Sequence, residues 1–156
     1  EEKGLYGSKY FADNPVVPID KIVAQLNVDM VGRNFQNRAS ESNRFFAVGS
    51  DRISTDLQNT LVRANESLPT PLDINYEMND PWDPERIYYR SDHYSYAAKG
   101  IPVIFFFTGL HPDYHQVTDE PQYIDYPHYT RITQYINDLV LDIANRAQRP
   151  ALDRKP

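Results

Sequence analysis

The sequence predicts an α/β fold with a largely parallel sheet, and three features of the chain lead to this prediction. Strand-like and helix-like segments alternate along the 156 residues, which is the pattern of α/β domains. Residues 21–32 and 101–107 are mostly continuous apolar runs, as expected of strands that a parallel sheet buries on both faces. Residues 128–147 repeat apolar side chains at helical spacing, which predicts one long amphipathic helix.

The N-terminal part is expected to form a short helix and then the first strand. Ser8 is a candidate N-cap for a helix through Tyr10 and Phe11, because its hydroxyl can accept a hydrogen bond from a free backbone N–H. A loop punctuated by prolines follows, and the strand at 21–32 then ends at Gly32.

The middle of the chain predicts two more strands with a helix between them. Residues 44–50 are a strand-like run, and residues 54–66 predict a helix with Asp51 or Ser54 as its N-cap. Apolar and polar residues alternate weakly over 72–78, which predicts a further strand. The apolar face of the helix is expected to consist of Ile53, Leu57, Leu61 and Val62.

The C-terminal part predicts a short helix, a buried strand and the long final helix. Residues 91–100 form the short helix, which Gly100 ends directly before the apolar strand at 101–107. A loop at 109–127 is rich in His, Asp and Tyr. The buried face of the final helix is expected to carry Ile132, Ile136, Leu139, Val140 and Ile143. We expect a single domain over residues 1–148 and a flexible tail over 149–156.

Composition narrows the classes of function. A net charge of −6 argues against a nucleic-acid partner, because phosphate binding needs a concentrated basic field. No apolar run approaches the roughly 20 residues that a membrane-spanning helix needs. With no cysteine in the chain, thiolate metal sites, thiol catalysis and disulfides are excluded. A bound metal would have His and carboxylate ligands, which favours zinc, manganese or cobalt.

Asp29 is the first of three polar features that a structural role does not require. It interrupts the apolar run LNVDMVG, where an unpaired charge would cost several kcal/mol. It is therefore either paired, bound to a metal, or half exposed at the end of the strand.

The second feature is His115, in the loop that follows the strand at 101–107. A histidine in a loop is more often solvated than a ligand, but here His111, Asp113 and Asp119 are close in sequence. These neighbours predict a polar site and also offer competing candidates for its ligands.

The third feature is the pair Glu1 and Glu2. Adjacent carboxylates are most often a charged surface pair, and on an extended segment they point to opposite sides. Both can serve one site only if the backbone turns there, and the nearby Gly4 allows such a turn.

In order and spacing, these segments resemble peptidase family M28, the di-zinc aminopeptidases. The resemblance runs from residue 1 to about residue 145, and its motifs are EEKGLYGS, NVDMVG, SDHYSYAAKGIP, FFFTGLHPDYH and QVTD. It implies a three-layer α/β/α fold of the zinc-dependent exopeptidase kind. It also implies a hydrolase that acts on peptides, a metallopeptidase with two zinc ions, and secretion or a periplasmic location.

The resemblance assigns roles to four residues. Glu1 would be the general base that takes a proton from the attacking water, and Glu2 would be a zinc ligand. His115 would share the metal of Glu2, while Asp29 would bind the other ion. Two such ions stand roughly 3.5–4 Å apart and act together on the scissile carbonyl and the water.

Four further residues match positions that support the site or the substrate. Asp92 would support the metal site through hydrogen bonds, although it is equally compatible with an N-cap. Tyr88, or alternatively Tyr89, would donate to the substrate's carbonyl oxygen as it becomes an oxyanion, although a buried aromatic is the ordinary role of either. Arg90 would bind a substrate carboxylate or form a surface salt bridge.

One departure from the family pattern concerns the start of the chain. The family also uses a His and a bridging Asp upstream of the Glu-Glu pair, and neither is present here. We therefore expect the chain to be the C-terminal part of a catalytic domain that is truncated on its N-terminal side. Such a fragment is expected to be inactive alone, and an exposed sheet edge is expected to favour self-association.

Two alternatives remain beside the aminopeptidase: another enzyme of the same fold, either carboxypeptidase-like or glutaminyl-cyclase-like, and a non-catalytic module. A glutaminyl-cyclase-like enzyme would use one zinc and a more hydrophobic pocket, with Tyr88, Tyr89 and Trp82 as candidate wall residues. A non-catalytic receptor or scaffold of the same superfamily would have lost its metal ligands. Against this second alternative, every ligand that these residues could supply is still in the sequence.

Overall fold

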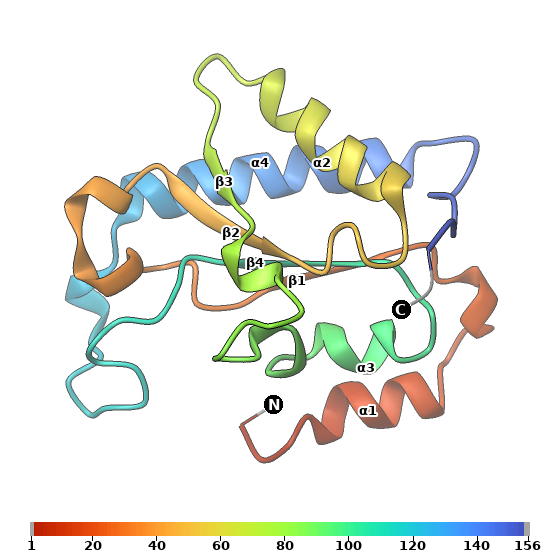
Figure 1. Cartoon of the computed structure of the whole chain (residues 1–156), viewed down its shortest axis with the longest axis horizontal. Coiled ribbons are helices and arrows are strands. Elements are labelled where there is room, and N and C mark those ends of the chain that lie inside the picture. The colour runs from red at the N-terminus through yellow and green to blue at the C-terminus, as the bar shows by residue number, and fades with distance from the viewer. Residues whose placement is uncertain (1, 155–156) are drawn as a thin grey trace.

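A computed structural model describes residues 2–154 and shows a four-stranded sheet with helices on both faces. Helices α2 and α4 cover one face, and α1 and α3 lie against the other, so the fold has three layers (Figure 1). The strands are β1 (Gln25–Val28), β2 (Arg44–Val48), β3 (Asp73–Asn75) and β4 (Val103–Phe107). The helices are α1 (Tyr6–Asp13), α2 (Thr55–Glu66), α3 (His93–Ala97) and α4 (Tyr126–Ala144). Short 3₁₀ turns lie at Ile19–Lys21, Phe35–Asn37, Ala39–Glu41, Glu77–Asn79, Ile87–Tyr89 and Pro121–Tyr123.

The sheet is mostly parallel, with the strand order β1-β4-β2-β3. Strand β1 runs parallel to β4 and β2 runs parallel to β3, whereas β2 and β4 are antiparallel. The α/β class is confirmed, but the antiparallel central pair was not predicted, because an apolar pattern does not encode strand direction. Since β1 and β4 are parallel, their carboxyl ends lie at the same edge of the sheet.

The core between the sheet and the helices α2 and α4 contains most of the predicted apolar face of α4. Tyr135 is also fully buried there, and its hydroxyl donates to the carbonyl oxygen of Leu61 over 2.7 Å. Two predictions of buried residues were wrong, because Val140 is exposed and Val62 is only half buried. The buried members of this core are Val31, Phe45, Ala47, Leu57, Leu61, Leu72, Ile104, Phe106, Ile132, Tyr135, Ile136, Leu139 and Ile143.

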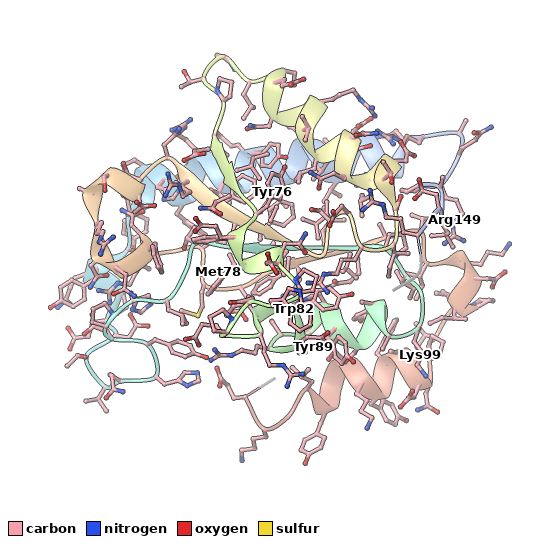
Figure 2. The ribbon with its side chains drawn as sticks, viewed as in Figure 1. Tyr76, Met78, Trp82, Tyr89, Lys99 and Arg149 are labelled. Carbon is pink, nitrogen blue, oxygen red and sulfur yellow. The ribbon has the colours of Figure 1, made fainter. Side chains whose placement is uncertain are left out.

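Helix α1 packs against α3 and the turn that follows it. The rings of Phe11 and Tyr96 pack with centroids 5.9 Å apart, and Lys99, labelled in Figure 2, pairs with Asp13 at 2.6 Å. The hydroxyls of Ser8 and Ser95 lie 2.9 Å apart. The prediction that Ser8 is the N-cap was wrong, because α1 begins at Tyr6 and Ser8 lies inside it.

Other element boundaries differ by a few residues from the sequence prediction. Strand β1 ends at Val28, so Asp29 follows the strand rather than interrupting it, and β3 covers only part of 72–78. Ser54 is the N-cap of α2, as its side chain accepts from the backbone N–H of Leu57. Asp125 caps α4 in the same way, through the N–H of His128, which moves the start of this helix to Tyr126.

The segment after α4 returns along the molecule. Arg149, at the right of Figure 2, donates to the carbonyl oxygens of Asp20 and Ile22. Asp153 accepts a hydrogen bond from the backbone N–H of Thr55 over 2.8 Å. Across the described residues, none of the helices combines the length and the apolar character that crossing a bilayer would need.

Candidate active site

A cavity of about 160 Å³ opens at the edge of the sheet where β1 and β4 end, and it brings together three of the predicted metal ligands. Glu2 comes from the turn before α1, Asp29 directly follows β1, and His115 comes from the loop after β4. The wall consists of Glu2, Asp29, Met30, Ile87, Arg90, Ser91, Phe105, Phe107, Leu110, Tyr114, His115 and Asp119. Glu1 lies outside the described residues.

Glu2 and His115 form a direct contact in this cavity. A carboxylate oxygen of Glu2 lies 3.1 Å from Nε2 of His115, and both side chains are more than half exposed. The imidazole stacks on the ring of Tyr114, with centroids 3.8 Å apart. The backbone of His115 has a φ of 58°, a left-handed conformation that is uncommon for a residue other than glycine.

Asp29, also in the cavity wall, is held by hydrogen bonds. Its backbone N–H donates to the carbonyl oxygen of Phe106 over 3.3 Å, and its Oδ2 accepts from the hydroxyl of Ser91 over 2.9 Å. The amide of Asn27 donates to the same hydroxyl over 2.9 Å. Asn27 and Asp29 are two residues apart, so their side chains leave the same face of the strand.

Ser91 was missed by the sequence analysis, which favoured its neighbour Asp92. Asp92 stands at the N-cap position of α3, where its side chain makes no capping hydrogen bond within the described structure. Ser91 is buried and contacts Asp29 directly. The sequence feature that could have pointed to Ser91 is the SDH triplet, in which this serine directly precedes Asp92.

Arg90 lies in the cavity wall, but the two tyrosines before it do not. Its guanidinium pairs with Glu85 at 3.1 Å and with the hydroxyl of Tyr114 at 3.4 Å. Tyr88 is buried, with the guanidinium of Arg52 3.9 Å from its ring centroid, and burial raises its pKa to about 12. Tyr89, labelled in Figure 2, is partly exposed and packs against Tyr94 with ring centroids 4.9 Å apart.

His93 is the buried histidine of the SDH triplet and lies beneath the cavity rather than in its wall. Its ring stacks on Phe105 with centroids 4.5 Å apart, and neither ring nitrogen has a hydrogen-bond partner among the residues described. Burial lowers the pKa of His93 to about 3, so the ring is neutral near pH 7. It therefore contributes to packing, not to the donor set of the cavity.

The donors in the cavity have the chemistry that zinc prefers, which is imidazole nitrogen with carboxylate oxygen. Two such ligands on one tetrahedral zinc stand roughly 3.4 Å apart, given bonds of about 2.0–2.2 Å. The 3.1 Å contact between Glu2 and His115 is close to that value, and it also suits a hydrogen bond without a metal. In the part of the chain described, no three His, Asp or Glu side chains converge into a complete metal site. Asp29 thus stands apart from the pair.

Comparison with known proteins points to one family. The model of peptidase family M28 matches residues 1–140. No curated protein matches the chain.

Solved structures with the same fold include three bacterial aminopeptidases. The LapA aminopeptidase of Legionella pneumophila aligns over 94% of this chain and 38% of its own, with 21% identity and a TM-score of 0.70. The aminopeptidase of Aneurinibacillus sp. strain AM-1 aligns over 99% and 33%, with 24% identity and a TM-score of 0.68. The zinc aminopeptidase BSAP of Bacillus subtilis aligns over 89% and 32%, with 17% identity and a TM-score of 0.67. The chain thus spans about a third of the length of these solved structures.

Proposed function

The chain belongs to peptidase family M28, and on this premise we propose that the protein carrying it is a zinc-dependent aminopeptidase. The observation that carries the proposal is the single cavity, at the end of two parallel strands, whose wall includes Glu2, Asp29 and His115. These three residues come from distant parts of the sequence, and a purely structural role does not require an imidazole and two carboxylates there.

The proposed roles divide the donors between two zinc ions. Glu2 and His115 hold one ion, in keeping with their 3.1 Å contact, and Asp29 holds the other. Zinc in such a site supplies a Lewis acid for the scissile carbonyl and lowers the pKa of water. Glu1 is the proposed general base, because the residue that takes the proton must keep its basicity and so is not itself a ligand.

The cavity wall suggests the substrate class. Met30, Ile87, Phe105, Phe107 and Leu110 give it an apolar floor beside the charged donors. We therefore propose a peptide substrate with an apolar N-terminal side chain, which would gain about 1.5–3 kcal/mol by leaving water. Arg90 is the proposed partner of a substrate carboxylate.

Tyr88, Tyr89 and Asp92 keep roles that are proposals from the family pattern. Burial raises the pKa of Tyr88 to about 12, which keeps its hydroxyl protonated, but Tyr88 is buried outside the cavity wall, so its role as a donor to the substrate receives less support. A glutaminyl-cyclase-like activity receives less support, because Trp82 is exposed and outside the cavity wall.

Location and assembly are further proposals. The family resemblance supports secretion or a periplasmic location, which fractionation of producing cells would test. Strand β1 is the edge of the described sheet and Val28 on it is exposed, which supports self-association through this edge. Sedimentation over a range of concentrations would measure that association.

The function is tested, in the protein that carries this chain, by zinc-dependent hydrolysis of leucine p-nitroanilide with the variants Glu2→Gln, Asp29→Asn and His115→Gln. Glu66→Gln serves as the matched control, because Glu66 is an exposed carboxylate at the end of α2. We expect each site variant to lose at least about 100-fold in kcat/KM, and the control to keep the wild-type value. Equal rates in wild type and site variants would reject the peptidase, and zinc-independent peptide binding would favour the scaffold alternative.

A further inference from the structure

Arg33 joins the two loops that carry the proposed metal ligands. It lies four residues after Asp29, in the loop that follows β1, and its side chain is buried. Its guanidinium donates to Asp119 over 2.8 Å and to Asp113 over 2.7 Å. The same guanidinium also donates to the amide oxygen of Asn37 over 2.9 Å.

The two carboxylates that Arg33 binds stand on either side of His115. Asp113 precedes His115 by two residues and Asp119 follows it by four. One rigid guanidinium therefore fixes both ends of the segment that presents the imidazole, since its donors have a fixed geometry. Near its base, the same loop is tied to the β1 side by the hydroxyl of Thr108, which hydrogen-bonds the carbonyl oxygens of Met30 and Arg33.

The backbone at this place is strained in a way that needs such support. His115 has a φ of 58° and Met30, directly after Asp29, has a φ of 55°. Left-handed residues other than glycine cost on the order of 1–2 kcal/mol each. They persist only where the surrounding structure determines them, and they often occur at functional sites.

The ion pairs of Arg33 differ in location from another arginine cluster that would contribute only to stability. Arg44 also binds two carboxylates, Glu41 at 3.0 Å and Asp73 at 2.6 Å. That cluster lies at the start of β2, where no proposed ligand is attached to it. Arg33 differs because both of its carboxylate partners belong to the loop of His115, whose side chain reaches Glu2.

We propose that Arg33 is a positioning residue that holds His115 beside Glu2 and thereby sets the affinity of the site for zinc. This inference rests on the proposed function, since it assumes that His115 is a ligand. The inference also concerns how firmly the loop of His115 is held, and this part can be measured on the metal-free protein.

The experiment, on the protein that carries this chain, compares Arg33→Lys and Asp113→Asn with the matched control Arg44→Lys. Zinc affinity is measured by competition with a chelating dye, and hydrogen exchange is measured on metal-free protein over residues 110–119. We expect both site variants to bind zinc roughly 10-fold more weakly or worse. We also expect the loop amides to exchange about 10-fold faster, with neither change in Arg44→Lys. Asp113→Asn keeps the inference testable if Arg33→Lys fails to fold.

The outcomes separate the inference from the function. Unchanged loop exchange in the site variants would overturn the positioning role whether or not zinc binds. Wild-type affinity in the site variants would overturn it as well, while leaving the peptidase proposal in place. If the wild-type protein binds no zinc, the function itself fails, and with it the claim about affinity.

Discussion

The hydroxyl of Ser91 donates to Oδ2 of Asp29 over 2.9 Å and accepts from the amide of Asn27 over 2.9 Å. This contact ties the segment before α3 to the end of β1, and so fixes the carboxylate that faces the cavity. The hydrogen bond orients Asp29 in advance for the ligand role proposed for it, because Oδ2 is already held by Ser91.

Ser91→Ala removes that hydrogen bond without changing the size of the side chain much. We expect zinc affinity to fall about 10- to 100-fold, and the free energy of unfolding to fall by about 1–3 kcal/mol because the buried amide of Asn27 loses its partner. Chelator competition and urea unfolding measure the two effects. Ser95→Ala is the control, since Ser95 pairs with Ser8 in another part of the structure, and an equal loss of affinity there would contradict the role of Ser91.

His93 makes the protein sensitive to acid. Its pKa of about 3 lies below the ordinary value of 6.5 because the ring is buried. Below pH 6.5 the imidazole of His93 binds a proton in the unfolded chain but not in the native state. The free energy of unfolding therefore falls as the pH drops below 6.5. We expect His93 to contribute a loss of about 2 kcal/mol between pH 8 and pH 5.

The variant His93→Phe tests this prediction, because it keeps an aromatic ring against Phe105. Urea unfolding at several pH values should show a smaller loss of stability on acidification in the variant than in the wild type. Identical pH profiles for the two proteins would show that His93 is not buried in its neutral form.

Gly109 begins the loop that leads from β4 to His115, and its conformation excludes other residues. Its φ is 97°, and an added Cβ would overlap the ring of Phe35. We expect Gly109→Ala to lower the free energy of unfolding by about 2–4 kcal/mol, from backbone strain and overpacking together. Gly100→Ala is matched in conformation, with a φ of 79° and open space around the new Cβ. We expect Gly100→Ala to lower the free energy of unfolding by only about 1 kcal/mol. A larger decrease for Gly100→Ala than for Gly109→Ala would contradict the packing argument.

Much of the fold follows from local patterns in the sequence. The strand at 103–107 is a continuous apolar run, and α4 shows the periodicity of a helix packed on a core. The caps at Ser54 and Asp125 then set where α2 and α4 begin. The direction of the strands could not be predicted from these patterns. The antiparallel pairing of β2 with β4 depends on the path of the long connection between the two strands.

The candidate site was only partly visible in the sequence. Glu2, Asp29 and His115 were recognised as residues whose charge a core would not tolerate or whose motif matched a family, and the fold places all three at one cavity. Ser91 and Arg33 were missed, because their roles depend on contacts between residues more than 60 positions apart. The contacts of Arg33 have no local signal, and the SDH triplet marks Ser91 only as the neighbour of Asp92, so the three-dimensional structure is needed to reveal what each residue contacts.

The most direct test follows the side chains of His93, His111, His115 and His128 by NMR while zinc is added to the metal-free protein that carries this chain. We expect the ring signals of His115 to shift on binding, whereas those of His93, His111 and His128 keep their positions. We also expect the shift to disappear in Glu2→Gln but to survive in Glu66→Gln. If zinc shifted the ring signals of His111 or His128 instead, or left those of His115 unchanged, the assignment of His115 as a metal ligand would be contradicted.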